Sequence, residues 1–442
     1  MKNIVRINSK INPYNKIIEI PGDKSISIRC MLLASQAIGI SRIFNLLKSG
    51  DVNNTIKSLK KLGIKIYNKE NYTEVIGVGL NGFNFKNNIT IDAGNSGTFA
   101  RLVCGLLAKT NKSVKMVGDD SLSNRDFSRI IHPLRLFGVN FKTKNNKLPM
   151  HILGSNYLKP IIYKEKLGSA QVKSAIMIAS LNTPGVTKII SVPSRNHTEI
   201  MFKSCLNIPI RINKKKKVEE IKIKGQNNYK SFDYKIPGDI SSAAFLIVLT
   251  ILSKNSKLLI KNVNVNETRS GIIILLKKMN AKIKISNKKN YKGEKVADIQ
   301  IASSSKLKAI NCPKELNTKT IDEFLILFLV CARAKGVSKF VSLGELRQKE
   351  SDRLKIASEF LKSIGVNIRE NKSALKIYGN PQLEIKKKIT IKNFLKDHRV
   401  FMMSCIAALT LGGHFTIYDK DSINSSFPNF IKILKKLGAR II

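Results

Sequence analysis

The chain has 442 residues, a hydrophobic fraction of 43% and a formal net charge of +48 at pH 7. This length is enough for two or more domains, each with its own hydrophobic core, and the composition favours a globular protein. A membrane helix needs roughly 18 consecutive apolar residues. The longest apolar runs, such as "FLILFLVCA" from Phe324, are about half as long, so we expect a soluble protein.

The positive charge is typical of nucleic-acid-binding proteins, but its distribution favours another explanation. Lysine is spread along the whole chain beside asparagine, as an AT-rich genome would produce. Aromatic residues make up only 7% of the chain, and tryptophan is absent, so few side chains are available to stack on single-stranded bases. The positive charge is therefore best explained by drift of the composition in an AT-rich genome, together with the binding of anionic substrates. A basic nucleic-acid-binding protein stays as an alternative.

Residues 1–20 alternate apolar and polar side chains, which predicts a strand, and they lack the continuous apolar stretch of a signal peptide. The six cysteines are scattered along the chain. They form no CxxC pair and no cluster with histidine. We therefore predict no metal site, reduced cysteines in the core, and a cytoplasmic protein.

Six segments share one pattern, in which a turn of small or polar residues precedes an apolar helix. They begin at intervals of 70 to 83 residues, near Gly22, Asn95, Ser169, Asp239, Asp322 and His398. A second helix follows in each, and it ends at a residue that tolerates the left-handed conformation. These stops are Gly63, Gly138, Asn207, Asn280, Gly365 and Gly438. Such a period predicts six repeats, each made of strands and two helices, one buried and one amphipathic.

The sequence "IPGD" occurs at Ile20 and again at Ile236, at corresponding points of the first and fourth repeats. We therefore predict an α/β protein with three repeats in each of two domains. The N-terminal domain would span residues 22–236. The C-terminal domain would combine residues 1–21 with residues 237–442, so that the chain crosses between the domains near Pro21 and Pro237.

The starts of the first three buried helices carry cations and hydrogen-bond donors. A helix N-terminus presents unpaired N–H groups and partial positive charge, which favour a bound anion. The side chains placed there are Lys24, Ser25, Arg29, Thr98, Arg101, Ser169, Gln171 and Lys173. They predict an anion site assembled from several repeats.

The last three repeats differ, because acidic residues occur there beside the cations. The segments are "TIDEFL" with Asp322, "RQKESDRL" with Lys349, Glu350 and Arg353, and "KDHRV" with Asp397, His398 and Arg399. An acidic group beside cations can exchange protons while the cations hold phosphate or carboxylate groups. Taken singly, each segment is typical of a capped, salt-bridged surface helix. Their recurrence at equivalent points of the repeats favours a catalytic site.

The chain resembles the 5-enolpyruvylshikimate-3-phosphate (EPSP) synthases over essentially its whole length. The motifs are "PGDKSISIR", "GNSGTFAR", "GDDSLSNR", "GSAQVKSA", "SRNHTE", "NETR", "IDEF", "ELRQKESDRL", "DHR" and "SFPNF". Several of them are similar to the second class of the family, which is often tolerant of glyphosate. The resemblance implies the two-domain enolpyruvyl-transferase fold, with the N-terminal strand in the C-terminal domain and the active site between the domains.

The resemblance also implies a role for each matching residue. Lys24, Ser25 and Arg29 would hold shikimate 3-phosphate, together with Ser169, Gln171, Ser194 and Lys349. Ala170 and Asp322 would also bind substrate. Lys24, Gly97, Arg125, Arg353 and Arg399 would surround phosphoenolpyruvate. Asp322 would take the proton from the 5-hydroxyl, and Glu350 would protonate the methylene carbon. Lys24 and His398 complete the set assigned to catalysis.

The implied reaction needs an acid, a base and fixed positive charge, so neither a metal nor an organic cofactor is expected. The expected partners are the two small-molecule substrates, without nucleic acid or membrane, and the expected state is a monomer. The nearest alternative enzyme, UDP-N-acetylglucosamine enolpyruvyl transferase, typically has a cysteine in the loop before the arginine that matches Arg125. That loop has no cysteine here.

Two positions depart from the family pattern. Asp126 and Phe127 follow Arg125 where the family usually has proline and a methionine-like residue. The extra carboxylate could weaken Arg125 as an anion ligand or point to solvent. Ser425 and Ser426 precede "FPNF", where some members carry a lysine, so one phosphoenolpyruvate contact is in doubt.

Overall fold

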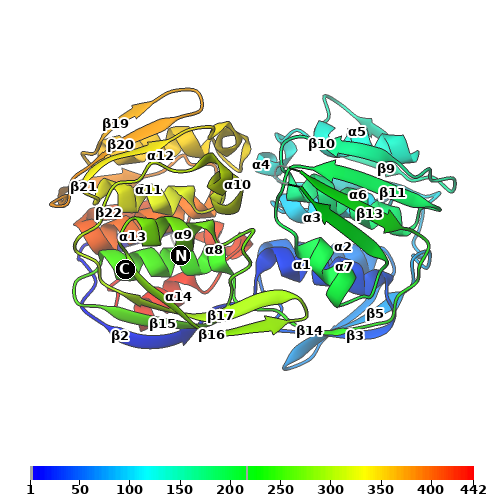
Figure 1. Ribbon diagram of the computed structural model, residues 1–442, viewed down its shortest axis with the longest axis horizontal. Helices are drawn as coiled ribbons and strands as arrows, with labels where there is room; N and C mark the ends of the chain where they lie inside the picture. Colours follow the sequence, from blue (N-terminus) through cyan, green and yellow to red (C-terminus); the bar gives the residue numbers. More distant parts are fainter. Residues whose placement is uncertain (1–2, 216–217) are drawn as a thin grey trace. The chain divides into compact units, whose positions relative to one another are not determined.

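The computed structural model describes residues 3–215 and 218–442, which fall into two units. The N-terminal unit contains Gly22–Pro237 together with Asn290–Glu294. The C-terminal unit contains residues 3–21, Gly238–Lys289 and Lys295–Ile442. In each unit the longer helices lie inside and the sheets lie around them (Figure 1).

The N-terminal unit has three four-stranded sheets with the same pairing pattern, in which the first pair is parallel and the next two are antiparallel. The first sheet has the order β14 (Asp233–Lys235), β3 (Ile38–Phe44), β5 (Tyr72–Val78), β4 (Lys65–Asn68). The second has the order β6 (Ile89–Asp92), β7 (Ser113–Val117), β9 (Met150–Leu153), β8 (Asn140–Thr143). The third has the order β10 (Ile162–Glu165), β11 (Val186–Ser191), β13 (Glu219–Lys224), β12 (Ile210–Lys214).

The helices of the N-terminal unit alternate between buried and amphipathic along the chain. The buried ones are α1 (Lys24–Gln36), α3 (Gly97–Leu106) and α6 (Ala170–Leu181). The others are α2 (Gly50–Lys61), the short α4 (Asp120–Ser123), α5 (Ser128–Phe137) and α7 (His197–Ser204). Helices α1 and α3 are in contact, as are α3 and α6.

The C-terminal unit repeats this arrangement with variations. Its sheets have the orders β16 (Lys282–Tyr291), β17 (Glu294–Ala302), β15 (Lys257–Asn264), β2 (Asn15–Glu19); then β18 (Gly336–Phe340), β20 (Leu375–Gly379), β19 (Asn367–Glu370); then β1 (Ile4–Ile7), β22 (Gly412–Tyr418), β21 (Ile385–Ile391). Its helices are α8 (Ile240–Leu252), α9 (Gly271–Lys278), α10 (Asn317–Thr320), α11 (Phe324–Ala332), α12 (Arg353–Ser363), α13 (His398–Leu411) and α14 (Phe430–Lys436). Short 3₁₀ turns occur at η1 (Lys314–Leu316), η2 (Gly344–Gln348) and η3 (Lys420–Ser425).

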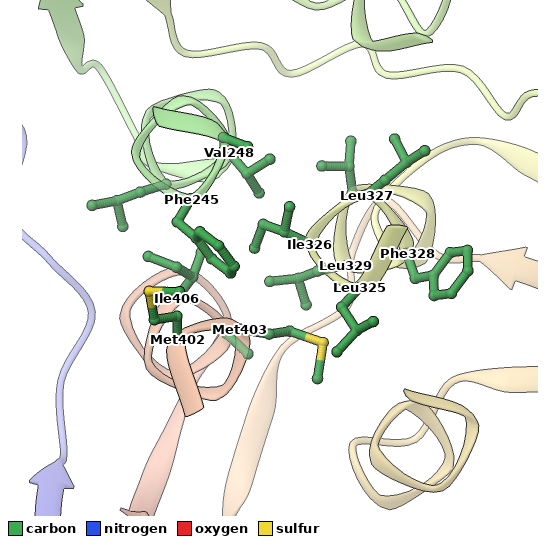
Figure 2. Packing of buried hydrophobic residues seen from close by; sticks show 14 of the residues in the cluster. Phe245, Val248, Leu325, Ile326, Leu327, Phe328, Leu329, Met402, Met403 and Ile406 are labelled. Carbon is green, nitrogen blue, oxygen red and sulfur yellow. The ribbon is translucent and has the colours of Figure 1, made fainter. Parts of the chain in front are cut away.

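The core of the C-terminal unit is formed by three helices that are apolar on nearly every side. Figure 2 shows Phe245 and Val248 of α8 facing Ile326 of α11, with Met402 and Met403 of α13 beside them. Every residue of α11 and of α13 is buried. Helices that are apolar all round are stable only inside a protein, surrounded by other elements, and the sheets provide that cover here.

The predicted repeat boundaries are confirmed. The six buried helices begin at or within two residues of the predicted starts. The six predicted stops all have positive φ, between 52° at Asn207 and 107° at Gly138. A strand follows the first five stops. After Gly438 the last residue, Ile442, exchanges backbone hydrogen bonds with Arg6 of β1 instead.

Residues 3–20 form two strands rather than one. Strand β1 pairs with β22, and β2 pairs with β15 in a different sheet. Between them, Pro13 has no N–H group for a strand ladder, and the buried Tyr14 hydroxyl bonds Thr250. The first two residues of the predicted strand lie outside the described residues. In the part of the chain that the structure describes, no helix is both long and apolar enough to cross a membrane.

Candidate active site

The start of α1 presents the first predicted cations of the N-terminal unit. Asp23 caps the helix, accepting a hydrogen bond from Ile26 N at 2.9 Å. This cap places Lys24 and Ser25 in the first turn. The Lys24 Nζ atom lies 2.8 Å from Asp51 Oδ2, in the first turn of α2. Lys24 is therefore held in place by a buried carboxylate.

The first turns of α3 and α6 are joined by side chains. Ser96 caps α3 and Ser169 caps α6, each accepting a hydrogen bond from a backbone N–H three residues on. Gln171 Nε2 donates to Thr98 Oγ1 at 3.1 Å. The loop before α6 is fixed by the Glu165 carboxylate, which accepts hydrogen bonds from three consecutive N–H groups of residues 167–169.

Gly97, the first residue of α3, lies against two arginines. A β-carbon at this position would lie 2.6 Å from Arg125 Nη1 and 2.7 Å from Arg101 Nη1. Arg101 also donates to the Gly97 carbonyl oxygen at 3.0 Å. Only glycine allows both guanidinium groups to approach the helix start this closely, so two cations meet the N-terminus of α3.

The structure accounts for both residues that depart from the family pattern after Arg125. Asp126 is exposed, and its carboxylate accepts hydrogen bonds from the backbone N–H and the hydroxyl of Ser128 at the start of α5. Phe127 is fully buried, and its ring centroid lies 4.9 Å from the guanidinium carbon of Arg101. This is cation–π distance. Asp126 thus fixes the turn that leads into α5, and Phe127 supports the second arginine.

The N-terminal unit therefore brings most of its predicted residues into one connected region. Arg29 joins α1 to α6 through Ser174, and to α7 through Thr198. Ala170 opens α6, and Ser194, which is 5% exposed, lies in the loop before α7. The helix starts, the cations and the small residues together are suited to binding anions.

In the C-terminal unit the predicted acidic and basic residues surround one guanidinium, that of Arg353, which begins α12. Its Nη2 atom lies 2.6 Å from Glu350 Oε2, and its Nη1 atom lies 3.5 Å from Asp322 Oδ1. Its Nε atom donates to Asp397 Oδ2 at 2.8 Å. Lys349 Nζ is 3.6 Å from the same oxygen of Asp322. The side chain of Arg353 is 1% exposed, so this is a buried ionic cluster rather than a surface helix cap.

The ionisation of this cluster is set by opposing effects. Burial disfavours the charged form of Arg353, but Asp397, Glu350 and Asp322 outweigh it and raise the pKa of Arg353 above its ordinary value. Burial likewise opposes ionisation of Asp397, while the attraction of Arg353, assisted by His398 and the hydrogen bond from Arg353, holds the pKa of Asp397 below its usual range. Both groups are therefore charged at neutral pH.

The start of α13 adds the remaining predicted residues. Asp397 caps the helix and accepts from Arg399 N at 3.0 Å. His398 and Arg399 are 3% and 7% exposed, so Arg399 is not the exposed cation that an isolated "DHR" typically provides. His398 Nδ1 lies 3.3 Å from Ser425 Oγ. Ser425, which stands near the position where some family members carry a lysine, thus contacts His398, a residue that the resemblance assigns to catalysis.

In each unit a carboxylate without a predicted role contacts a predicted cation: Asp51 was not among the candidate residues, and Asp397 was named only as part of its segment. Asp51 holds Lys24, and Asp397 holds Arg353. The local sequence carried a partial signal for both, because each is an acidic residue at the start of a helix, where a capping or first-turn acid is common. It carried no signal for the cation that each one contacts.

The fold of two α/β units is that of the enolpyruvyl transferases. The solved enolpyruvyl transferase NikO from Streptomyces tendae has this fold, with a TM-score of 0.77 and 14% identity over 99% of this chain and 98% of that one. The EPSP synthase from Acinetobacter baumannii matches more closely, with a TM-score of 0.86 and 31% identity over 99% of both chains.

Comparison by sequence is more specific. The family model of EPSP synthase (3-phosphoshikimate 1-carboxyvinyltransferase) matches residues 8–434. The 3-phosphoshikimate 1-carboxyvinyltransferase of Zymomonas mobilis is 39% identical over 98% of this chain and 96% of its own length. That of Ruthia magnifica is 38% identical over 98% of both. The chain belongs to the EPSP synthase family.

Proposed function

We propose that the chain transfers the enolpyruvyl group of phosphoenolpyruvate to the 5-hydroxyl of shikimate 3-phosphate and releases phosphate. This reaction belongs to the shikimate pathway of aromatic amino acid biosynthesis. The observation that carries the proposal is the cluster around Arg353, which holds the predicted base Asp322 and the predicted acid Glu350 on one guanidinium. The family match over nearly the whole chain supports the same reaction.

In the proposed mechanism Glu350 protonates the methylene carbon of phosphoenolpyruvate, and C2 becomes cation-like. The 5-hydroxyl of shikimate 3-phosphate attacks C2 while Asp322 takes its proton. The tetrahedral intermediate then loses phosphate and a proton from the methyl group, which regenerates the enol ether. Lys349 and Arg353 lie within 3.6 Å of Asp322 Oδ1, and fixed cations of this kind stabilise charge that develops in the transition state.

The substrate contacts are proposed from the same arrangement. Shikimate 3-phosphate would be held by Lys24, Ser25, Arg29, Ser169, Ala170, Gln171, Ser194 and Lys349. Phosphoenolpyruvate would be held by Lys24, Gly97, Arg125, Arg353 and Arg399. The helix starts at α1, α3 and α6 support the anion contacts. Because Arg353 is buried among carboxylates, we assign it a second task, which is to orient Asp322 and Glu350.

The test is to incubate the protein with shikimate 3-phosphate and phosphoenolpyruvate, and to measure phosphate release together with the mass of the product. UDP-N-acetylglucosamine replaces shikimate 3-phosphate in a parallel reaction. Asp352 provides a control for Asp322, because it directly precedes Arg353 in the sequence but forms a partly exposed pair with Arg347. Asp352→Asn should keep its activity, whereas Asp322→Asn should lose it. The proposal would be overturned if phosphate were released from phosphoenolpyruvate with UDP-N-acetylglucosamine as the acceptor but not with shikimate 3-phosphate.

We further propose that the enzyme acts as a cytoplasmic monomer and does not bind nucleic acid. Light scattering after size-exclusion chromatography measures the oligomeric state. Titration with duplex DNA at increasing salt tests the remaining alternative, because binding through counterion release weakens steeply with salt. Tight binding at physiological salt would show that the charge of +48 serves nucleic acid as well as anionic substrates.

A further inference from the structure

The guanidinium of Arg29 is fixed by three hydrogen bonds inside the N-terminal unit. Its Nε atom donates to Thr198 Oγ1 at 2.9 Å, and its Nη2 atom donates to Ser174 Oγ at 3.0 Å. Its Nη1 atom donates to the Ser25 carbonyl oxygen, one helical turn back, at 3.0 Å. The residue is 3% exposed. Each of the three guanidinium nitrogens therefore has a defined acceptor.

The two hydroxyls that meet Arg29 also bond each other. Ser174 Oγ and Thr198 Oγ1 are 2.8 Å apart. A hydroxyl has one O–H to donate and can accept as well. Because both oxygens accept from Arg29, one of them donates to the other, and the three groups close a ring. The pair occupies the Nε/Nη2 edge of the guanidinium, the edge whose parallel N–H groups suit two neighbouring oxygens.

These acceptors differ from those of two other buried arginines, Arg353 and Arg269. Arg353 bonds carboxylates, and Arg269 bonds the Asp239 carboxylate at 2.9 Å. The three acceptors of Arg29 named here are two hydroxyls and a carbonyl, all without formal charge. Such acceptors orient a guanidinium while offsetting less of its positive charge than a carboxylate would.

Helix α7 is anchored on both sides of Thr198. The preceding residue, His197, places Nδ1 2.5 Å from Glu294 Oε1, and both side chains are 1% exposed. The following residue, Glu199, places Oε1 2.5 Å from Nζ of the buried Lys173 on α6. Breaking a buried ionic contact is costly, so the contact between Glu199 and Lys173 holds the backbone of α7 against α6, and the contact with Glu294 fixes the residue before Thr198. The hydroxyl of Thr198 is thereby held at a defined position.

We propose that Thr198 and Ser174 are positioning residues for Arg29, and that their neutral hydroxyls hold its guanidinium in the orientation that binds shikimate 3-phosphate. The inference rests on the proposed function and on the role of Arg29 in it. It adds two residues that do not themselves contact the substrate but bond an arginine that does.

The first test measures the binding of shikimate 3-phosphate alone to the full-length protein by calorimetry, together with KM and kcat. Thr198→Val removes the hydroxyl at similar size, and it should raise the Kd and the KM for shikimate 3-phosphate about tenfold, the scale of one hydrogen bond to a charged group. Thr198→Ser keeps the oxygen and should restore most of the affinity. The KM for phosphoenolpyruvate should change less than twofold.

Ser180 offers a matched control for Ser174. Both serines lie on α6 and are almost fully buried, but Ser180 donates to the Met177 carbonyl oxygen of its own helix. Ser174→Ala should weaken binding of shikimate 3-phosphate several-fold, whereas Ser180→Ala should not. This comparison decides the question even if Thr198→Val fails to fold. Equal affinities in the two alanine variants would overturn the inference.

A double-mutant cycle shows whether Thr198 acts through Arg29. In an Arg29→Ala background, Thr198→Val should cause no further loss of affinity, because the group that it orients is gone. A full additional tenfold loss would mean that Thr198 acts on α7 generally, and would refute the positioning role. Failure of the proposed function would be seen separately, as an absence of turnover by the unmodified protein with both substrates.

Discussion

Replacing Asp397 by asparagine should destabilise the C-terminal unit far more than the same change at Asp352. Both aspartates cap a helix, α13 and α12 respectively, and both contact an arginine at 2.8 Å. They differ in environment. The side chain of Asp397 is 0% exposed and that of its partner Arg353 is 1% exposed, whereas the values for Asp352 and Arg347 are 35% and 23%.

The size of the effect follows from this difference in burial. Asparagine caps a helix about as well as aspartate, so the substitution mainly removes the charge. Removing one partner of a buried ion pair costs about 3–5 kcal/mol, since the other charge stays buried. A solvent-exposed pair contributes about 0–1 kcal/mol. Asp322 and Glu350 still contact Arg353 in the variant, so we expect the lower end, about 3 kcal/mol, for Asp397→Asn.

The assay is urea unfolding at pH 7, with the transitions of the two units fitted separately because a protein of two units need not unfold in one step. The pKa of Asp397 is depressed in the folded protein, so its contribution is complete above the unfolded aspartate pKa of about 3.9. It should disappear as the pH falls through the lower folded value. Equal losses of stability in Asp397→Asn and Asp352→Asn would refute the reasoning.

Three further outcomes are expected. Asp322→Asn and Glu350→Gln should each lower turnover roughly 10²-fold or more, because each removes a proton-transfer group. Steady-state kinetics would measure turnover, and calorimetry should show that shikimate 3-phosphate binding is retained. Normal turnover by either variant would exclude that residue from proton transfer. Gly97→Ala should raise both the KM for phosphoenolpyruvate and the inhibition constant of glyphosate roughly tenfold or more, because the new methyl group would lie 2.6 Å from Arg125 Nη1 and displace it; unchanged constants would show that neither ligand depends on this approach. The native protein should react slowly with a thiol reagent at pH 8, because burial raises the pKa of the thiols, to about 11 at Cys205 and about 12 at Cys104. Cys205, which is partly exposed whereas the other five cysteines are buried, should react first, and rapid labelling of all six would contradict the described core.

The repeat pattern and the kinds of residue at the helix starts could be predicted from the sequence because they depend on local physics. A buried helix needs an unbroken apolar run, and a helix that ends in a left-handed residue selects glycine or asparagine. Both signals recur six times along the chain, and the stops from Gly63 to Gly438 all have positive φ. The family motifs suggested the roles that we propose for Asp322, Glu350 and the cations, which no single local pattern indicates.

The sequence did not predict which side chains meet, since that depends on residues far apart in the chain. Arg353 contacts acids at positions 322, 350 and 397, and Arg29 bonds hydroxyls at 174 and 198. The segment Asn290–Glu294 joins the N-terminal unit although its neighbours on both sides along the chain belong to the other unit. Local sequence determined the elements and their capping residues, because capping and periodicity act within a few residues. Only the tertiary structure decided the charged partners, because a buried charge is stabilised by whichever oppositely charged or hydrogen-bonding groups the packing of helices and sheets brings to it.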